Sequence, residues 1–139
     1  MSTQNIKNHA QVVPLYHYFM TAVILTILVL ASINLFNGVS MLSVMFFLMA
    51  IALSLGMWFM RAFALKVQDR AIRAEENLRY YSLTGRLLDK NLRTSQIIAL
   101  RFADDEEFVD LADAALEKNM NNKEIKQAIQ NWKADHHRV

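Results

Sequence analysis

The sequence predicts an all-helical membrane protein: a two-helix transmembrane hairpin, whose second span continues as a long cytoplasmic stalk helix, followed by a small helical module. Three observations predict this fold. Two long runs near the N-terminus carry almost no charge, a dense group of basic residues follows the second run, and the remaining sequence combines helical periodicity with capping residues. The 139-residue chain is also 54% hydrophobic, which is high for a soluble domain.

The two uncharged runs have the length of membrane-spanning helices. From 15 to 36 only His17 can carry a charge, and residues 41–60 carry none. At about 1.5 Å per residue, each run forms a helix about 30 Å long, the thickness of the hydrocarbon core. The alternative is a signal peptide before a buried core helix. It is disfavoured because a signal peptide's apolar region usually has about 7–15 residues, and because the second full run follows directly after "NGVS".

The charge distribution predicts the orientation of the hairpin. The connection 37–40 is uncharged, whereas Arg61, Lys66, Arg70 and Arg73 follow the second span. Since positive charge stays on the cytoplasmic side, both termini are expected in the cytoplasm, with the hairpin in the membrane. The same four cations are expected to contact anionic lipid headgroups. The predicted segments are a tail (1–13), the hairpin (14–60), the stalk (61–84) and the module (85–139).

Small residues in both spans indicate close helix packing. They form pairs four positions apart, as in interfaces where helix backbones approach. Such packing serves either the hairpin itself or a span of a partner protein. The residues are Ala22 and Thr26 in the first span and Ala50, Ala52, Ser54 and Gly56 in the second.

The stalk carries an apolar stripe whose residues recur at steps of three and four, which places them on one helix face. The stripe consists of Ala64, Val67, Ala71, Ala74, Leu78 and Tyr81, and Gly85 is expected to end the helix. Asp69 with Arg73, and Glu75 with Arg79, have the spacing of ion pairs along a helix. The stripe predicts a contact with another helix, and a solvated stalk with an incidental stripe is the alternative.

Three short helices are expected in the module. The first begins with Thr94 or Ser95 as its cap, and the second with the acids of "DDEE", which favour a helix N-terminus. The third begins with Asn121 and Glu124 at capping-box spacing and is expected to include Trp132. Residues 61–103 have a net charge of +5 and residues 104–139 one of −4, so the acidic part should face away from lipid.

The C-terminal region is similar to a known pattern. "ALRFADDEEF" followed by "IKQAIQNWKADHHRV" resembles the signature of an uncharacterised bacterial family of short double-spanning membrane proteins with a charged C-terminal helical region. The resemblance extends over essentially the whole chain. It implies the architecture given above, and no activity, catalytic residue or binding residue.

No residue pattern indicates catalysis, a cofactor or a metal. The chain has no cysteine, no Gly-rich phosphate loop and no Ser-His-Asp arrangement. His136 and His137 are adjacent and provide at most two convenient ligands, and His17 has no second histidine in either span with which to hold a haem. We interpret the methionines at 41, 45 and 49 as packing residues and the "DDEE" acids as helix caps.

These observations favour a non-catalytic accessory or structural subunit of a larger inner-membrane complex. Its expected partners are integral membrane subunits and anionic lipid headgroups, with self-association as a further alternative. A membrane-anchored adaptor or regulator, whose module recruits a soluble protein through Arg101, Phe108 and Trp132, is the second hypothesis, since aromatic residues and arginine dominate interfaces. Nucleic acid is not expected as a partner because the distal module is acidic, and no small-molecule substrate is expected.

Overall fold

The computed structural model describes residues 12–135, which form an all-helical fold. The described residues contain no β-strand, and one isolated antiparallel bridge joins Ala103 to Trp132. The predicted all-helical class is therefore confirmed. In chain order the elements are η1 (Leu15–Met20, a π-helical turn), α1 (Thr21–Asn37), α2 (Met41–Thr84), α3 (Thr94–Leu100), α4 (Asp105–Glu117) and α5 (Asn122–Ala128).

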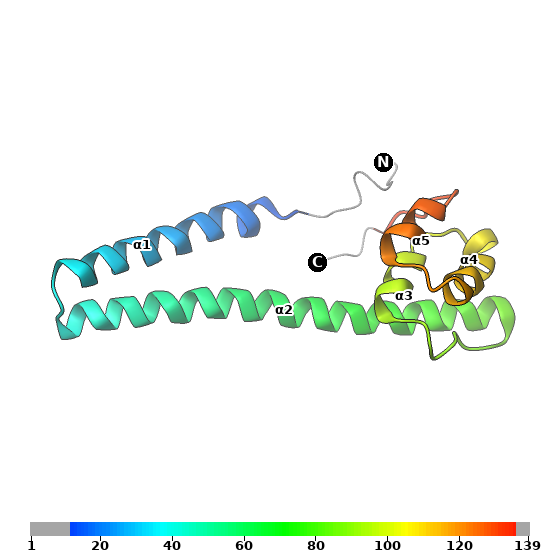
Figure 1. Ribbon diagram of the computed structural model, residues 1–139, viewed down its shortest axis with the longest axis horizontal. Helices are drawn as coiled ribbons and strands as arrows, with labels where there is room; N and C mark the ends of the chain where they lie inside the picture. Colours follow the sequence, from blue (N-terminus) through cyan, green and yellow to red (C-terminus); the bar gives the residue numbers. More distant parts are fainter. Residues whose placement is uncertain (1–11, 136–139) are drawn as a thin grey trace. The chain divides into compact units, whose positions relative to one another are not determined.

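The chain divides into two compact units, and α2 contributes to both. The first unit is Val12–Ala64, and the second begins at Leu65. In the first unit, α1 and the initial part of α2 run antiparallel (Figure 1). The helical stretches Leu15–Asn37 and Met41–Thr84 are both long and apolar enough to cross a membrane.

Polar contacts join the two helices of the first unit at both ends. At one end the Tyr16 hydroxyl donates to the Met57 carbonyl at 2.9 Å. At the other end the buried Ser43 hydroxyl accepts a hydrogen bond from the Ser40 backbone N–H at 2.8 Å and donates to the Gly38 carbonyl at 3.0 Å. Ser43 thus satisfies backbone groups that the turn between the helices would otherwise leave unpaired.

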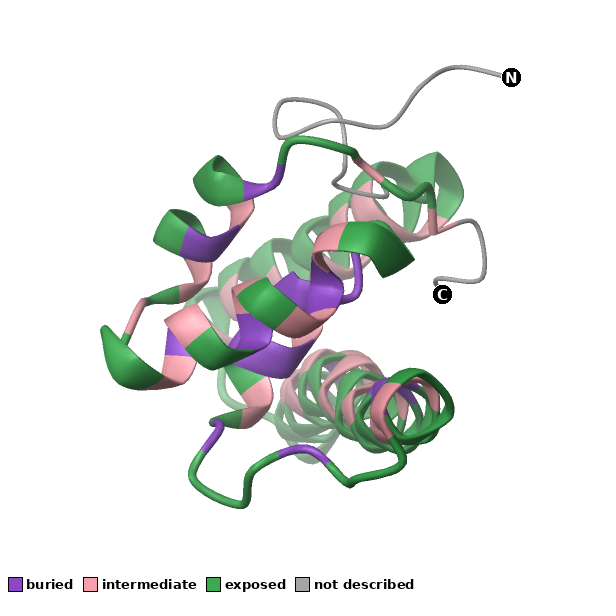
Figure 2. Ribbon diagram, turned by 90° about the vertical axis from the view of Figure 1, so that its right-hand side faces the viewer, coloured by how far each residue is buried: buried purple, intermediate pink, exposed green. Residues whose placement is uncertain are grey.

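The second unit has one hydrophobic core, to which the final part of α2 contributes together with α3, α4 and α5 (Figure 1). Buried residues gather where these helices meet (Figure 2). Tyr80 from α2 packs edge-on against Phe108 from α4, with ring centroids 6.0 Å apart. The other members of the core are Leu88, Leu92, Ile97, Ala99, Leu100, Phe102, Ala103, Ala112, Ala115, Ile125 and Ile129.

The buried side chain of Gln96 links α3 to the connection that follows α4. Its amide nitrogen donates to the carbonyls of Ala115 (3.2 Å) and Met120 (2.8 Å), and its oxygen accepts from the Arg93 N–H (2.8 Å). A buried amide with all these partners adds specificity to the core without an unsatisfied polar group.

The predicted helix caps are mostly confirmed. Asp104 caps α4, and Asn121 caps α5 by accepting from the backbone N–H groups of Lys123 and Glu124. The Glu124 carboxylate accepts in return from the Asn121 N–H at 2.6 Å. Gly85 follows α2 with φ of +73°, as a C-terminal glycine requires. The cap predicted for α3 is wrong, because α3 begins at Thr94 itself and Arg93 occupies the cap position.

The predicted extent of the last helix is also wrong. α5 ends at Ala128, and the residues from 129 to 135 are not helical. The carboxylate of Glu107 on α4 accepts the backbone N–H groups of Gln130 (3.0 Å) and Asn131 (2.9 Å), and Lys133 N–H donates to the Phe102 carbonyl at 2.8 Å. These contacts satisfy the backbone outside a helix and place Trp132 against Phe102, with ring centroids 5.2 Å apart.

Candidate functional site

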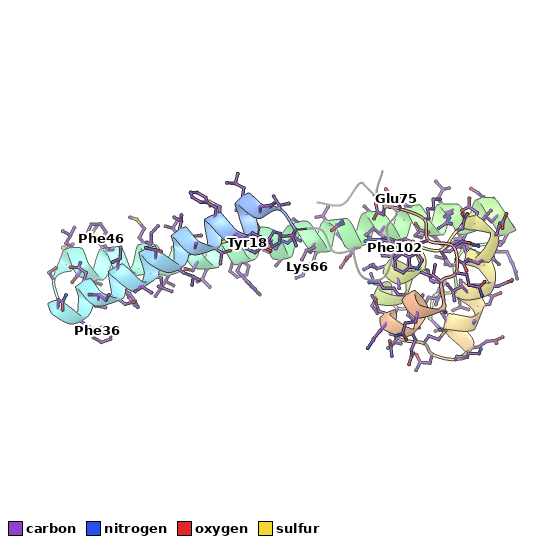
Figure 3. All side chains as sticks on the ribbon, turned by 90° about the horizontal axis from the view of Figure 1, so that it is seen from above. Tyr18, Phe36, Phe46, Lys66, Glu75 and Phe102 are labelled. Carbon is purple, nitrogen blue, oxygen red and sulfur yellow. The ribbon has the colours of Figure 1, made fainter. Side chains whose placement is uncertain are left out.

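The first unit exposes most of its large apolar side chains. Phe36 has 90% of its surface exposed and points away from the helix pair (Figure 3), and Phe46 has 46% exposed. Only 6% of the apolar window of Leu15–Asn37 and 11% of that of Met41–Thr84 is buried. Apolar surface of this extent calls for a covering of lipid or protein.

The small residues predicted to pack together lie partly in buried and partly in exposed positions of the first unit. Ala50 is almost fully buried and Ser54 is half-buried. Ala52 and Gly56 lie on an exposed part of α2, and a Cβ atom added at Gly56 would have no neighbour within 4 Å. A role for Gly56 in packing α2 against α1 is therefore wrong, whereas a contact with a partner span stays a prediction. Ala22 and Thr26 on α1 are likewise exposed.

The predicted partner stripe on α2 is also exposed. Its proposed contact residues Ala64, Val67, Ala71 and Ala74 are all classed as exposed, and so are Leu78 and Tyr81. The residues of α2 that instead pack into the second unit are Ile72, Glu76 and Tyr80, which are buried. The spacing of the stripe gives no information about these three residues, which lie on another face of α2.

Arg79 is the centre of a charged network that joins α2 to α4. Its guanidinium lies 3.1 Å from the Glu76 carboxylate, donates to Asp105 at 2.6 Å and to the Ala103 carbonyl at 2.7 Å, and lies 4.3 Å from the centre of the Phe108 ring. The expected pairs Asp69–Arg73 and Glu75–Arg79 are not among the ion pairs of residues 12–135. Arg79 pairs instead with a different residue of its own helix, Glu76, and with the distant residue Asp105 on α4.

This network changes the pKa values of two carboxyl groups in opposite directions. Burial raises the pKa of Glu76, although its hydrogen bond and attraction to Arg79 oppose the change. The hydrogen bond from Arg79 lowers the pKa of Asp105. The same guanidinium therefore stabilises one partly buried and one exposed carboxylate.

The module residues predicted as partner contacts lie inside the second unit. Phe108 is fully buried, Arg101 is 6% exposed, and Trp132 packs partly buried against the core. The Arg101 guanidinium lies 4.6 Å from the Phe102 ring centre, and its Nε atom lies 3.2 Å from the Asp135 carboxylate. Phe108 and Arg101 have almost no surface to offer a partner, so their prediction as contact residues is wrong. Their aromatic and charged character serves the core instead.

A basic groove in the second unit contains three of the four predicted headgroup-binding residues. It has a volume of about 600 Å³ and is lined by Lys66, Val67, Asp69, Arg70, Arg73 and Thr94. Lys66 projects from α2 (Figure 3). Arg73 lies beside Thr94, with 3.5 Å between Nη1 and the hydroxyl oxygen. Arg61 belongs to the first unit and is half-buried there. Thr94 was not predicted, because only the fold places it beside α2.

The exposed side of α4 carries a line of carboxylates. Glu106, Asp110, Asp113 and Glu117 recur at steps of four, three and four, and all are exposed. None of them belongs to an ion pair of the described residues. Asp113 accepts a hydrogen bond from the Tyr80 hydroxyl at 3.4 Å. The acidic side chains predicted for the module therefore include a row along the exposed side of α4.

Within residues 12–135, no group of three or more histidine, aspartate and glutamate side chains is arranged to hold a metal ion. His136 and His137, which could provide at most two convenient metal ligands, lie outside the described residues.

Comparison with known proteins identifies the family of the chain. No curated protein and no solved structure matches it. One family model, "Family of unknown function (DUF6526)", matches residues 1–139, the full length of the sequence. The resemblance to an uncharacterised family is thereby confirmed, and the chain belongs to the DUF6526 family.

Proposed function

We propose that this protein is a non-catalytic accessory subunit of a larger bacterial inner-membrane complex. Its hairpin docks against the spans of other subunits, with both termini in the cytoplasm. The second span continues as a stalk, and the stalk and its module brace a cytoplasmic face of the complex.

The exposure of the first unit supports a place in the membrane. A core helix of a soluble protein is mostly buried, whereas the apolar windows here are only 6% and 11% buried. The first charged residue after the second apolar run is Arg61, and Lys66, Arg70 and Arg73 follow it. This distribution favours cytoplasmic termini by the positive-inside rule.

The observation that carries the proposal is the division of α2 into two faces. Ile72, Glu76 and Tyr80 pack into the second unit, while the small and apolar stripe that includes Val67, Ala71 and Ala74 is exposed. A stripe of alanine and valine suits the close approach of another helix. The stripe belongs to the same helix as the second apolar run, because α2 extends from Met41 to Thr84.

The acidic line on α4 favours a second candidate function, that of a membrane-anchored adaptor. Four exposed carboxylates on one helix side suit a basic surface on a soluble protein. An adaptor of this kind would bind its partner less strongly at high salt. Its module would have to extend far enough from the membrane to meet the partner, but would not require one particular orientation about the axis of α2.

An insertion of two alanines between Ala64 and Leu65 distinguishes these functions. This position lies at the boundary of the two compact units, so the contacts within each unit are kept. The insertion turns everything that follows by about 200° and lengthens α2 by only about 3 Å. For an accessory subunit we expect loss of stoichiometric assembly, measured by purification from native membranes in mild detergent.

A four-alanine insertion at the same place is the phase-matched control. It rotates the second unit by a net angle of about 40° and adds about 6 Å, so assembly should recover in part. Normal stoichiometry with the two-residue insertion would contradict the bracing role. A co-purifying soluble protein that is released at high salt would then favour the adaptor.

The orientation of the hairpin can be tested separately by cysteine labelling. The chain contains no cysteine, so Val39→Cys provides a single thiol in the turn between the spans. A membrane-impermeant maleimide is expected to label Val39→Cys in spheroplasts, and to label Lys123→Cys only after lysis. The opposite pattern would show that the termini are outside.

A further inference from the structure

We propose that the basic groove, lined by Lys66, Val67, Asp69, Arg70, Arg73 and Thr94, is a binding site for the headgroup of a phospholipid with two negative charges. The inference rests on the membrane placement given under Proposed function. It goes beyond a general attraction of basic residues to the membrane, because it assigns one lipid class to one groove.

The charge of the groove suits a doubly charged ligand. Lys66, Arg70 and Arg73 contribute three positive charges and Asp69 one negative charge, which leaves +2. In the described residues, ion pairs involve Arg79, Arg101 and Lys133, but none of the three groove cations. Three cations around one hollow repel one another until an anion binds, and a lipid with two phosphate charges neutralises them.

The shape and polarity of the groove suit a lipid headgroup. Its volume of about 600 Å³ lies in the range of sites that enclose whole ligands. The hydroxyl of Thr94 can donate or accept a hydrogen bond, and the carboxylate of Asp69 can accept one, from a free glycerol hydroxyl of the headgroup. Val67, which is 67% exposed, adds an apolar wall that a free phosphate ion would not need.

The position of the groove along α2 favours a membrane lipid over a soluble anion. Lys66 follows the last residue of the apolar run, Met60, by six positions, which is about 9 Å along a helix. Side chains on a helix lean toward its N-terminus. On α2 this direction runs toward Met41, the end of the helix that begins with the apolar run.

Lipid binding to the full-length protein in mild detergent tests this site. The protein is titrated separately with diphosphatidylglycerol, phosphatidylglycerol at twice the concentration, and phosphatidylcholine. Native mass spectrometry counts the lipids retained. We expect one strongly retained diphosphatidylglycerol molecule, about fivefold weaker binding for Arg70→Gln, and about 25-fold weaker binding for Arg70→Gln with Arg73→Gln.

The matched control is Lys118→Gln with Lys123→Gln, which removes two exposed cations of the same unit that do not line the groove. This control should bind diphosphatidylglycerol as the unchanged protein does. Should the double groove variant misfold, Lys66→Gln and Arg70→Gln as single changes still test the site, since neither side chain forms an ion pair within residues 12–135.

Three results would overturn the lipid site. These are equal retention of phosphatidylglycerol at matched charge, an equal loss of binding in the control, and displacement of the lipid by inorganic phosphate at millimolar concentration. The last result would assign the groove to a soluble phosphate. Loss of partner subunits with lipid selectivity retained would count against the accessory role alone, so the two proposals fail separately.

Discussion

Phe108→Ala is expected to lower the free energy of unfolding of the second unit by about 3–5 kcal/mol. The Phe108 ring is fully buried, meets Tyr80 edge-on, and lies beneath the Arg79 guanidinium. Its loss leaves a cavity where α2 and α4 meet. A unit of about 70 residues has a total stability of about 4–10 kcal/mol, so this one change removes much of it.

Trp132 provides the measurement in the full-length protein. The only other tryptophan, Trp58, lies in the first unit and is replaced by phenylalanine in all variants. Urea unfolding in mild detergent is then followed by Trp132 fluorescence. Tyr81→Ala is the matched aromatic control, since Tyr81 is exposed on α2, and its expected effect is within about 0.5 kcal/mol. Equal effects of the two variants would contradict the core position of Phe108.

Local features of the chain could be predicted from the sequence. The two candidate spans follow from runs without charge, and the cap formed by Asn121 and Glu124 follows from residues three positions apart. Gly85 could be predicted because a positive φ at the end of a helix strongly favours glycine. In each case the interacting groups are close in the sequence.

Contacts between distant residues could not be predicted in the same way. Arg79 was expected to pair with Glu75, one turn away, but it pairs with Glu76 and with Asp105, which is 26 positions away. Trp132 was expected on a helix because its spacing from Ile125 and Ile129 is helical. Glu107 accepts the backbone N–H groups of Gln130 and Asn131 instead, and helix periodicity carries no information about that partner.

The basic groove and the predicted partner contacts likewise depend on how distant residues pack, which the sequence pattern does not give. The sequence predicted Lys66, Arg70 and Arg73 as a basic group, but not the groove or the contribution of Thr94. It predicted Phe108 and Arg101 as contacts because these residue types are frequent in interfaces. The same types are also suited to a core, and only the packing decides between the two roles.

Arg79→Met is expected to lower the stability of the second unit by about 3–5 kcal/mol at pH 8, and by less at pH 5. The substitution keeps an apolar side chain of similar length but leaves the buried Glu76 carboxylate without its ion-pair partner. Burial already raises the pKa of Glu76, and removal of Arg79 raises it further. An acid whose pKa is higher in the folded state binds more protons in the folded state than in the unfolded state. The variant therefore loses stability as pH rises from the unfolded pKa of Glu76 through its folded pKa.

The loss of the Arg79–Asp105 contact also makes the stability of Arg79→Met, relative to the unchanged protein, depend on pH in the same direction. Its pKa is lowered by the hydrogen bond from Arg79, so in the unchanged protein it contributes stability above its unfolded pKa, which is lost as pH falls through the folded pKa. Arg79→Met removes that contribution as well. The contribution of Asp105 to the difference in stability should therefore decrease only at a pH below its unfolded pKa, so that the change between pH 8 and pH 5 reports on Glu76.

A second substitution separates charge from packing in this network. If the unpaired carboxylate causes the loss, adding Glu76→Gln to Arg79→Met should restore part of the stability at pH 8, because it removes the uncompensated charge. Arg86→Met, at an exposed position, controls for the loss of one positive charge and should change stability by less than about 0.5 kcal/mol. Urea unfolding followed by Trp132 fluorescence at pH 5 and pH 8 measures all four proteins. An equal loss at both pH values, without recovery by Glu76→Gln, would instead assign the contribution of Arg79 to its contact with Phe108 and its hydrogen bond to the Ala103 carbonyl.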